Sequence, residues 1–246
     1  MAEHGFSTGI LYQTEIPIVQ RICNFALSGA TAIELNYASP DDLLTANPES
    51  LFVNMVKPHA FYYISIHAPW QEVKYGNNEQ TRKIIEKFAE FCDILPINGI
   101  VMHPDIVQSF SVLENTNLPF LLENMDKRKD FYTMPEHFYD ILKNYGFGFV
   151  LDVQHAYEQD HSMNIGNAFL DAFGDRLKEL HVSGSSLSSS NPHHEFHCPI
   201  SLAENKVAIG KILRQNPKIP KILEGIISAD IPAVLNADLA YLSNFQ

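Results

Sequence analysis

Residues that can bind metal ions stand at the ends of apolar runs along this chain. In GFVLDVQHAY, residues 148–157, an apolar run ends on Asp152, and His155 follows in the next loop. A lone histidine or carboxylate at such a place is more often structural, but here every run from the third onward ends in this way. The residues that end these runs are His67, His103, Glu123, Asp152, His181 and Glu224. Three candidates lie outside the runs, namely His155, Glu195 and His197.

Together these side chains offer imidazole nitrogens and carboxylate oxygens without a thiolate. This mixture suits Zn²⁺, Mn²⁺ or Fe²⁺ better than Ca²⁺. Few basic residues lie near the motifs, and buried carboxylates without a counter-charge are costly, so a divalent cation is the simplest explanation of the set. The set is larger than one ion can use. It therefore predicts two or three ions, zinc foremost, with Glu123 and Glu224 as candidate bridging ligands.

Eight apolar runs of strand length alternate with segments of helical periodicity. Such runs are typical of parallel strands buried on both faces. They occupy residues 5–11, 31–36, 62–67, 99–103, 119–124, 148–153, 177–183 and 220–225. Helical spacing and start signals, such as the T-x-P-E segment that begins at Thr133, predict helices between the runs. These helices span 14–28, 41–57, 78–95, 133–146, 164–174, 203–215 and 230–243, with a weaker helical pattern at 105–116.

The alternation predicts an α/β fold, a (β/α)8 TIM barrel in which residues 1–246 form one domain. A doubly wound sheet needs the same alternation but rarely uses eight units. In a barrel the carboxyl ends of all strands meet on one face. The candidate ligands would therefore point into one cavity.

At these residues the sequence resembles the xylose isomerase-like TIM barrels, and most closely their endonuclease IV branch, AP endonuclease family 2. The resemblance covers nearly the whole chain and is clearest from the third run to the eighth. LD-x-x-HA and LKELH are specific motifs, whereas LLEN alone is weak. The matching segments are IHAPW, MHPD, LLEN, LDVQHAY, LKELHVS, EFHCPI and ILEG.

The resemblance implies three metal ions, usually zinc. Carried over by position, the ligands of the first ion are His67, His103 and Glu123. Those of the second are Glu123 as a bridge, Asp152, His181 and Glu224. Those of the third are His155, Glu195 and His197. Relatives that isomerise or epimerise sugars generally keep one ion, at the residues that match Glu123, Asp152, His181 and Glu224.

Several positions depart from the nuclease pattern. Glu195 stands where the family usually has Asp, and Ser201 stands where it has Gly. The segment MDKRKD follows Glu123 in place of a small, Gly-rich loop. The nucleases also carry basic loops that grip DNA, whereas this chain is short and acidic. The longer Glu195 side chain bears on the geometry of the third metal site, whereas the loop and charge differences bear on the substrate.

Two chemistries fit the candidate site. A phosphoester or phosphodiester hydrolase would use the metal cluster to activate water and to clamp phosphate oxygens. A sugar isomerase or epimerase would hold a hydroxyketone on one ion, while Glu123 and Glu224 move a proton through an enediolate. We favour the hydrolase, because the number of ligands is more specific than net charge. Glu123 and Glu224 are the candidate catalytic residues in either case.

Two loop features could contact a substrate. Trp70, the only tryptophan, follows His67 by three residues and could stack on a sugar or a base. Lys127 and Arg128, with Lys129, form the basic cluster after Glu123 and could meet a phosphate. Packing in the loop and simple solvation are the competing interpretations. The expected partner is a small sugar or phosphoester, or abasic DNA, with no obligate protein partner evident.

Composition narrows the function classes. With 17 basic and 29 acidic residues the formal charge is -12, which disfavours general nucleic-acid binding because phosphate contacts come mainly from Lys and Arg. Three scattered cysteines indicate a reducing compartment rather than a disulfide framework. No secretory signal is recognised at the start, and no apolar run is long enough to span a bilayer. We therefore expect a cytoplasmic protein without a membrane segment.

Overall fold

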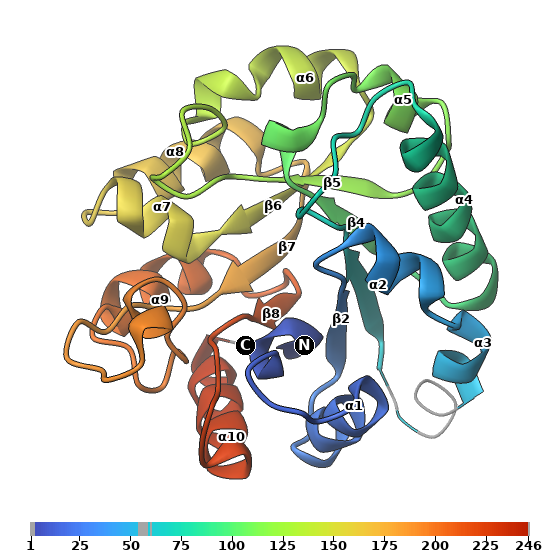
Figure 1. The fold of residues 1–246 in the computed structure, drawn as a ribbon. Coiled ribbons are helices and arrows are strands. Elements are labelled where there is room, and N and C mark those ends of the chain that lie inside the picture. The colour runs from blue at the N-terminus through green and yellow to red at the C-terminus, as the bar shows by residue number, and fades with distance from the viewer. Residues whose placement is uncertain (1–2, 54–58, 60, 246) are drawn as a thin grey trace.

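The computed structural model, which describes residues 3–53, 59 and 61–245, is a closed barrel of parallel strands surrounded by helices (Figure 1). Each strand pairs with the next along the chain, and the first pairs with the last. The strands are β1 (His4–Ser7), β2 (Ala32–Asn36), β3 (Tyr63–His67), β4 (Gly99–Met102), β5 (Phe120–Glu123), β6 (Gly148–Asp152), β7 (Leu177–Val182) and β8 (Lys221–Leu223). The predicted (β/α)8 barrel is confirmed.

Helices follow the strands and cover the outside of the barrel (Figure 1). Most carry a strip of buried apolar residues, as in the predicted 78–95 segment, where Ile84, Phe88 and Phe91 pack inward. The helices are α1 (Ile18–Leu27), α2 (Pro40–Thr45), α3 (Pro48–Leu51), α4 (Glu79–Ile94), α5 (Ser111–Glu114), α6 (Tyr139–Asn144), α7 (Val153–Gln159), α8 (Asn164–Phe173), α9 (Lys206–Gln215) and α10 (Ile231–Leu242).

Local capping explains where the structure departs from the predicted helices. The predicted 41–57 helix is broken after α2, because Asn47 caps a new helix that starts at Pro48; its predicted residues 54–57 lie outside the described part of the chain. In the predicted 133–146 helix, the turn η4 (Pro135–His137) precedes the shorter α6, and no side-chain cap forms at Met134. The weak pattern at 105–116 gives only the turn η3 (Pro104–Ile106) and α5.

Two junctions differ from the sequence prediction. The first apolar run is a strand only to Ser7, and the 3-10 turn η1 (Thr8–Leu11) follows it. The loop predicted after Asp152 is wrong, because helix α7 begins at once at Val153. The Asp152 side chain accepts a hydrogen bond from the His155 backbone amide and thereby caps this helix. A strand that ends on a capping residue can enter a helix without a linker.

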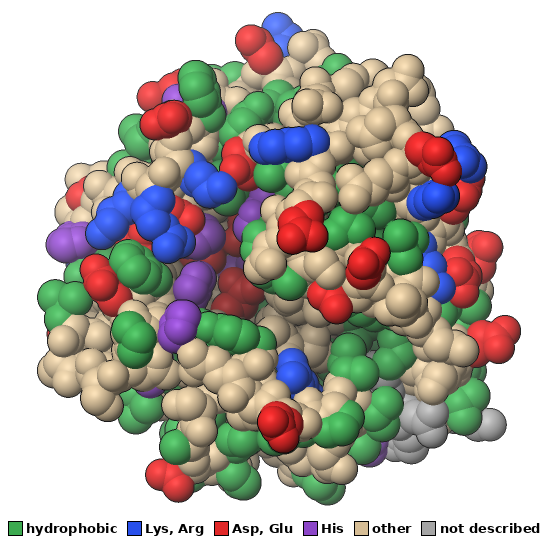
Figure 2. Space-filling view, in the orientation of Figure 1, with side chains coloured by type: hydrophobic (Ala, Val, Ile, Leu, Met, Phe, Trp, Pro, Cys, Tyr) green, Lys and Arg blue, Asp and Glu red, His purple; other side chains and the backbone are tan. Residues whose placement is uncertain are grey.

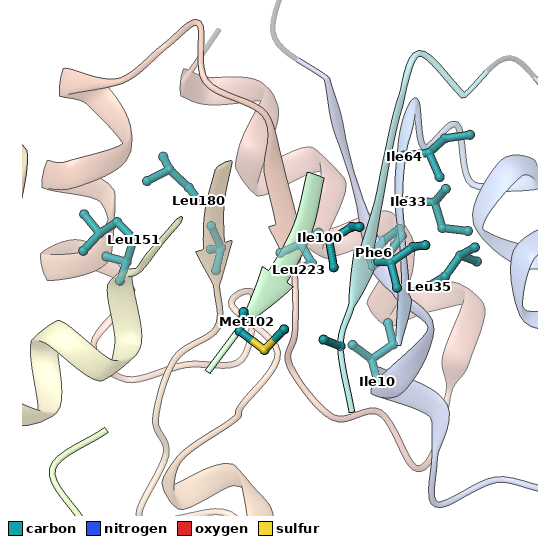
Figure 3. Close-up of a cluster of buried hydrophobic side chains, with 14 of the residues drawn as sticks. Phe6, Ile10, Ile33, Leu35, Ile64, Ile100, Met102, Leu151, Leu180 and Leu223 are labelled. Carbon is teal, nitrogen blue, oxygen red and sulfur yellow. The ribbon is translucent and has the colours of Figure 1, made fainter. Parts of the chain in front are cut away.

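The strands bury both faces, but the two faces differ. Outward side chains such as Ile33, Leu35 and Ile64 join one large apolar core between strands and helices (Figure 3). The alternate residues point inward. Inside the barrel lie two small apolar clusters, one of Ala32, Tyr63 and Ile222 and one of Val101, Leu121 and Val150.

Several polar residues occupy the alternate strand positions whose side chains point into the barrel. Glu34 and Asn36 alternate with Ile33 and Leu35, and Asp152 pairs in register with His181 of the next strand. Period-two alternation therefore places these polar side chains inside the barrel rather than in the outer core. None of the helices formed by the described residues combines the length and apolar character that crossing a membrane requires.

Candidate metal centre

The side chains at the strand ends converge into two groups that share one carboxylate. The ligand atoms within each group all lie within 4.8 Å of one another. The first group consists of His67, His103 and Glu123. The second consists of Glu123, Asp152, His181 and Glu224. Six of the sequence-predicted ligands, from six different strand ends, are thus brought together.

Glu123, at the end of β5, directs its two oxygens to different groups. Oε2 lies 3.4 Å from Nε2 of His67 and 3.3 Å from Nε2 of His103. Oε1 lies 3.1 Å from Nδ1 of His181, on the other side of the carboxylate. A carboxylate in this arrangement can hold one cation with each oxygen.

Neighbouring groups fix the orientation of the histidines. Nδ1 of His67 donates to the backbone carbonyl of Ala68 at 3.0 Å, which leaves Nε2 free to face Glu123. The indole of Trp70 packs edge-on against His67, with ring centroids 4.9 Å apart, and also lies beside His103. Trp70 therefore supports the first group as well as lining the cavity.

Asp152 and the neighbouring Asn124 join the ends of β5 and β6. The Asn124 amide donates to the Asp152 carbonyl at 3.0 Å and accepts from the Asp152 backbone N–H at 2.8 Å. The carbonyl of Asn124 in turn accepts from Nδ1 of His155 at 2.9 Å. Sequence reasoning missed Asn124, although it follows Glu123 directly in the LLEN segment and continues the run of polar residues there.

Among the described residues, histidines and not Lys or Arg form the ion pairs with the carboxylates of the centre. Burial favours the neutral form of Glu123, but His181, His103 and His67 hold its pKa well below the usual value. Burial raises the pKa of Asp152 to about 7, and the nearby carboxylate charges contribute. For His67, burial opposes protonation, but hydrogen bonding and carboxylate charges raise its pKa to about 9. Protons on histidines thus neutralise part of the carboxylate charge.

Two orphaned oxygens test whether metal ions fit this centre. Oε2 of Glu123 and Oδ2 of Asp152 are buried, and the histidine nitrogens nearest to them, at 3.3–3.4 Å, do not form well-oriented hydrogen bonds with them. Unpaired buried carboxylate oxygens are costly unless a cation satisfies them. Each orphaned oxygen belongs to a group of nitrogen and oxygen donors of the kind that zinc, manganese and iron accept. The residues present therefore fit divalent cations.

The third predicted set is not assembled in the same way. The rings of His155 and His197 lie 5.9 Å apart, centroid to centroid, but the Glu195 side chain is exposed on the turn η5 (Pro192–Glu195). Among the described residues, the three do not form a compact ligand group. Burial and the positive charge of His155 lower the pKa of His197 to about 4, so a neutral imidazole is available there. Their role as ligands stays a prediction.

Two buried carboxylates beneath the centre were not predicted. Glu34 on β2 and Glu179 on β7 form a further compact group with His181. Both are fully buried. Their positions within TAIELN and LKELH could have predicted this, because alternation along each strand makes both side chains point inward. A glutamate at an inward position of a buried strand needs a partner inside the barrel.

A cavity of about 530 Å³ opens above the two groups. Figure 2 shows histidine and carboxylate side chains gathered in the hollow of this face, with Lys and Arg side chains near its rim. Arg128 and Lys129 line the cavity, but Arg128 is paired with Asp126 at 2.8 Å and Lys129 with Asp105 at 2.6 Å. Lys127 lies over the Phe196 ring, 5.6 Å from its centroid, and is not among the described residues that line the cavity.

Comparison with known proteins gives similarity in structure but not in sequence. No protein-family model matches the chain, and no curated protein matches its sequence. Endonuclease IV from Thermus thermophilus superimposes with a TM-score of 0.71 at 18% identity, covering 98% of this chain and 99% of that one. This chain and these structures share one barrel fold. The fold prediction made from the motifs is therefore confirmed.

Enzymes of other chemistry share this fold. A D-tagatose 3-epimerase-like protein gives a TM-score of 0.67 at 18% identity, covering 99% of this chain and 98% of that one. The 3-keto-D-glucoside 4-epimerase from E. coli gives 0.65 at 16% identity, covering 99% and 100%. At these identities the likeness extends to the fold, so the reaction must be argued from the site itself.

Proposed function

We propose that this protein is a metal-dependent enzyme that hydrolyses phosphoesters at a dinuclear centre, with zinc as the foremost metal. The observation that carries the proposal is the position of Glu123, whose two oxygens face two separate ligand groups. Bridging carboxylates of this kind hold two cations close enough to act on one substrate. Manganese and iron suit the same donors.

Divalent ions at these groups would lower the pKa of a bound water molecule to near neutrality. They would also offset the negative charge of a phosphate. The protein residues supply the geometry for this chemistry. Glu123 and Glu224 would act as ligands rather than as proton carriers, and both carboxylates lie beside Nδ1 of His181. Arg128 and Lys129 stand at the cavity wall, where they can bind phosphate oxygens once their aspartate partners are exchanged.

The size and charge of the site favour a small phosphoester over abasic DNA. The cavity holds about 530 Å³, within the range of small-molecule sites. Arg128 and Lys129, the Arg and Lys side chains that line it among the described residues, are already ion-paired, and the chain carries a formal charge of -12. A third ion, at the set predicted for His155, Glu195 and His197, requires the exposed Glu195 carboxylate to turn toward the two rings.

A sugar isomerase or epimerase is the second candidate, and one observation favours it. The second group is complete by itself, since it offers one nitrogen and three carboxylates around a single point. In that reaction Glu123 and Glu224 would move a proton at the carbon beside a carbonyl group. The first group, with His67 and His103, would then bind substrate hydroxyls instead of a second cation.

Metal stoichiometry together with substrate turnover separates the two candidates. Protein purified without chelator is saturated with Zn²⁺ or Mn²⁺, desalted, and analysed for bound metal. Two or three ions per chain, with hydrolysis of p-nitrophenyl phosphate or its diester, support the hydrolase. A single ion per chain, with exchange of a ketose proton for deuterium and no phosphoester turnover, overturns it in favour of the isomerase. Cleavage of an abasic duplex in the same assay extends the substrate to DNA.

A further inference from the structure

The interior of the barrel beneath the metal centre holds two carboxylates where branched apolar residues usually pack. Glu34 extends from β2 and Glu179 from β7, and both side chains have 0% exposure. Neither was counted among the candidate ligands, and neither lines the cavity above. A buried carboxylate is costly, so its contacts should reveal what it does.

Glu179 is held from two sides by hydroxyl groups. Its Oε2 accepts a hydrogen bond from the Tyr63 hydroxyl at 2.8 Å. Its Oε1 accepts from the Ser65 hydroxyl at 3.3 Å and lies 2.9 Å from Nε2 of His181. Because Tyr63 and Ser65 both belong to β3, the carboxylate is fixed across the barrel from its own strand.

His181 presents its other ring nitrogen to the metal centre. Nδ1 lies 3.1 Å from Oε1 of Glu123 and 3.2 Å from Oε2 of Glu224. When Nε2–H donates to Glu179, Nδ1 is the nitrogen that remains to bind a cation held by those two carboxylates. The hydrogen bond made by one ring nitrogen decides which tautomer is present and which nitrogen can bind a metal.

We propose that Glu179 is a positioning residue that holds His181 with Nε2 protonated and Nδ1 directed to the second ligand group. This inference rests on the metal centre of the proposed function, but not on which reaction that centre catalyses. Loss of Glu179 should weaken the binding of the ion at the second group only. Among the described residues, Glu179 belongs to no ligand group with His67 or His103.

Glu34 is the natural comparison for Glu179. Its Oε2 lies 3.2 Å from the same Nε2, farther than Glu179, and neither of its oxygens has a hydrogen-bond partner among the described residues. An additional cation held by Glu34, Glu179 and Nε2 would require an imidazole without any proton while Nδ1 binds its own ion. The hydrogen bond from Nε2 to Glu179 needs no such species and is the simpler arrangement.

The test measures zinc affinity in a background in which the first group is disrupted. His103→Ala removes a ligand of that group, and the number of ions that remain to be titrated is counted by elemental analysis. In this background Zn²⁺ is titrated against a chromophoric chelator for Glu179→Leu and for its matched control, Glu34→Leu. We expect Glu179→Leu to weaken zinc binding by about 10–100-fold, and Glu34→Leu by no more than about threefold.

A second variant and a spectroscopic signal protect the test against misfolding. Glu179→Gln keeps an oxygen that can accept from Nε2–H, so it should weaken binding less than Glu179→Leu but more than Glu34→Leu. In zinc-loaded protein, the one-bond ¹⁵N–¹H signal of His181 Nε2–H should persist in the Glu34 variant and vanish in Glu179→Leu. Should Glu179→Leu fail to fold by circular dichroism, unchanged affinity in Glu179→Gln overturns the proposal.

Other outcomes contradict the inference directly. Equal loss of affinity in Glu34→Leu and Glu179→Leu, or an extra ion that both variants release, would mean that the carboxylates themselves bind a cation. Since activity is not measured, the proposed function can fail independently. A wild-type protein that binds two ions but hydrolyses no phosphoester still tests Glu179, whereas a protein that binds no metal overturns both proposals.

Discussion

At the scale of single residues, the centre depends on histidines that serve as counter-charges. Among the described residues no Lys or Arg pairs with Glu123; His67, His103 and His181 each lie within 3.4 Å of one of its oxygens, and raised pKa values keep protons on His67 and His181. A divalent cation can take the place of the protons on these histidines, so the same geometry serves with metal and without it. Removing one histidine should therefore affect one ion and not the other.

His103→Ala should reduce the bound metal from two ions per chain to one. His103 belongs only to the first group, whereas the second keeps all four of its side chains. Elemental analysis after saturation and desalting gives the count, and phosphoester hydrolysis should fall by at least about 100-fold if both ions are used. His161→Ala, at an exposed histidine stacked on Tyr157, is the control and should keep both ions. Full hydrolase activity in His103→Ala with one ion would rule out the dinuclear mechanism.

Arg128→Ala should weaken the binding of phosphorylated substrates. The guanidinium lies at the cavity wall, 4.7 Å from the centroid of the Phe196 ring, and is held by Asp126. A charge-assisted contact to phosphate is worth about 1.5 kcal/mol or more, so KM should rise about tenfold with a smaller change in kcat. Steady-state kinetics measures both constants. Lys127→Ala should raise KM less, and an equal effect would mean that only the general charge of the loop matters.

At the scale of elements, the ends of β5 and β6 are built as one unit with the start of α7. Asn124 bridges the backbone of Asp152, and the Asp152 side chain caps the helix that carries His155. The strand, the ligand and the helix start are therefore fixed by a few hydrogen bonds rather than by a loop. This arrangement explains how His155 comes to lie beside the centre despite its position on a helix.

Asn124→Ala should destabilise this junction and loosen the second ligand group. It leaves a buried backbone N–H and a buried carbonyl of Asp152 without a partner, at a cost of about 2–4 kcal/mol in the free energy of unfolding. Denaturant unfolding measures the loss, and zinc titration should show weaker binding of one ion. The control is Asn78→Ala, which removes the cap of α4 and should cost about 1 kcal/mol without any change in zinc affinity. Unaltered zinc binding in Asn124→Ala would show that the junction does not position Asp152.

At the scale of the whole molecule, acidic residues buried away from the centre reduce the stability of the folded protein at neutral pH. Asp238 on α10 is almost fully buried, and its Oδ1 accepts from the Ser201 backbone N–H at 2.8 Å. Burial raises its pKa to about 6, although hydrogen bonds from Ser201 favour the charged form. The folded protein therefore binds this proton more tightly than the unfolded chain does. The contribution of Asp238 to stability thus falls as the pH rises from about 4 to 6.

Asp238→Asn should be more stable than the wild type at neutral pH and show little difference at pH 4. The amide oxygen can still accept from Ser201, and the buried charge is gone, so the gain at pH 7 should be about 1–3 kcal/mol. Urea unfolding at several pH values measures it. Asp160→Asn should behave in the opposite sense, because hydrogen bonds from Ser162 lower the pKa of Asp160. A gain for Asp238→Asn that does not depend on pH would show that charge is not the cause.

The sequence alone determined the barrel and six of the candidate ligands. Apolar runs of strand length mark parallel strands, and the six ligands that end the later runs come together because the carboxyl ends of barrel strands share one face. Only the tertiary structure decided that α7 starts at once after Asp152, that Glu195 is exposed, and that Glu34 and Glu179 meet His181. The physical reason is the distance along the chain between the residues that interact. Periodicity and capping act over a few residues, whereas these contacts join side chains from strands far apart in the chain, which come together only when the barrel closes.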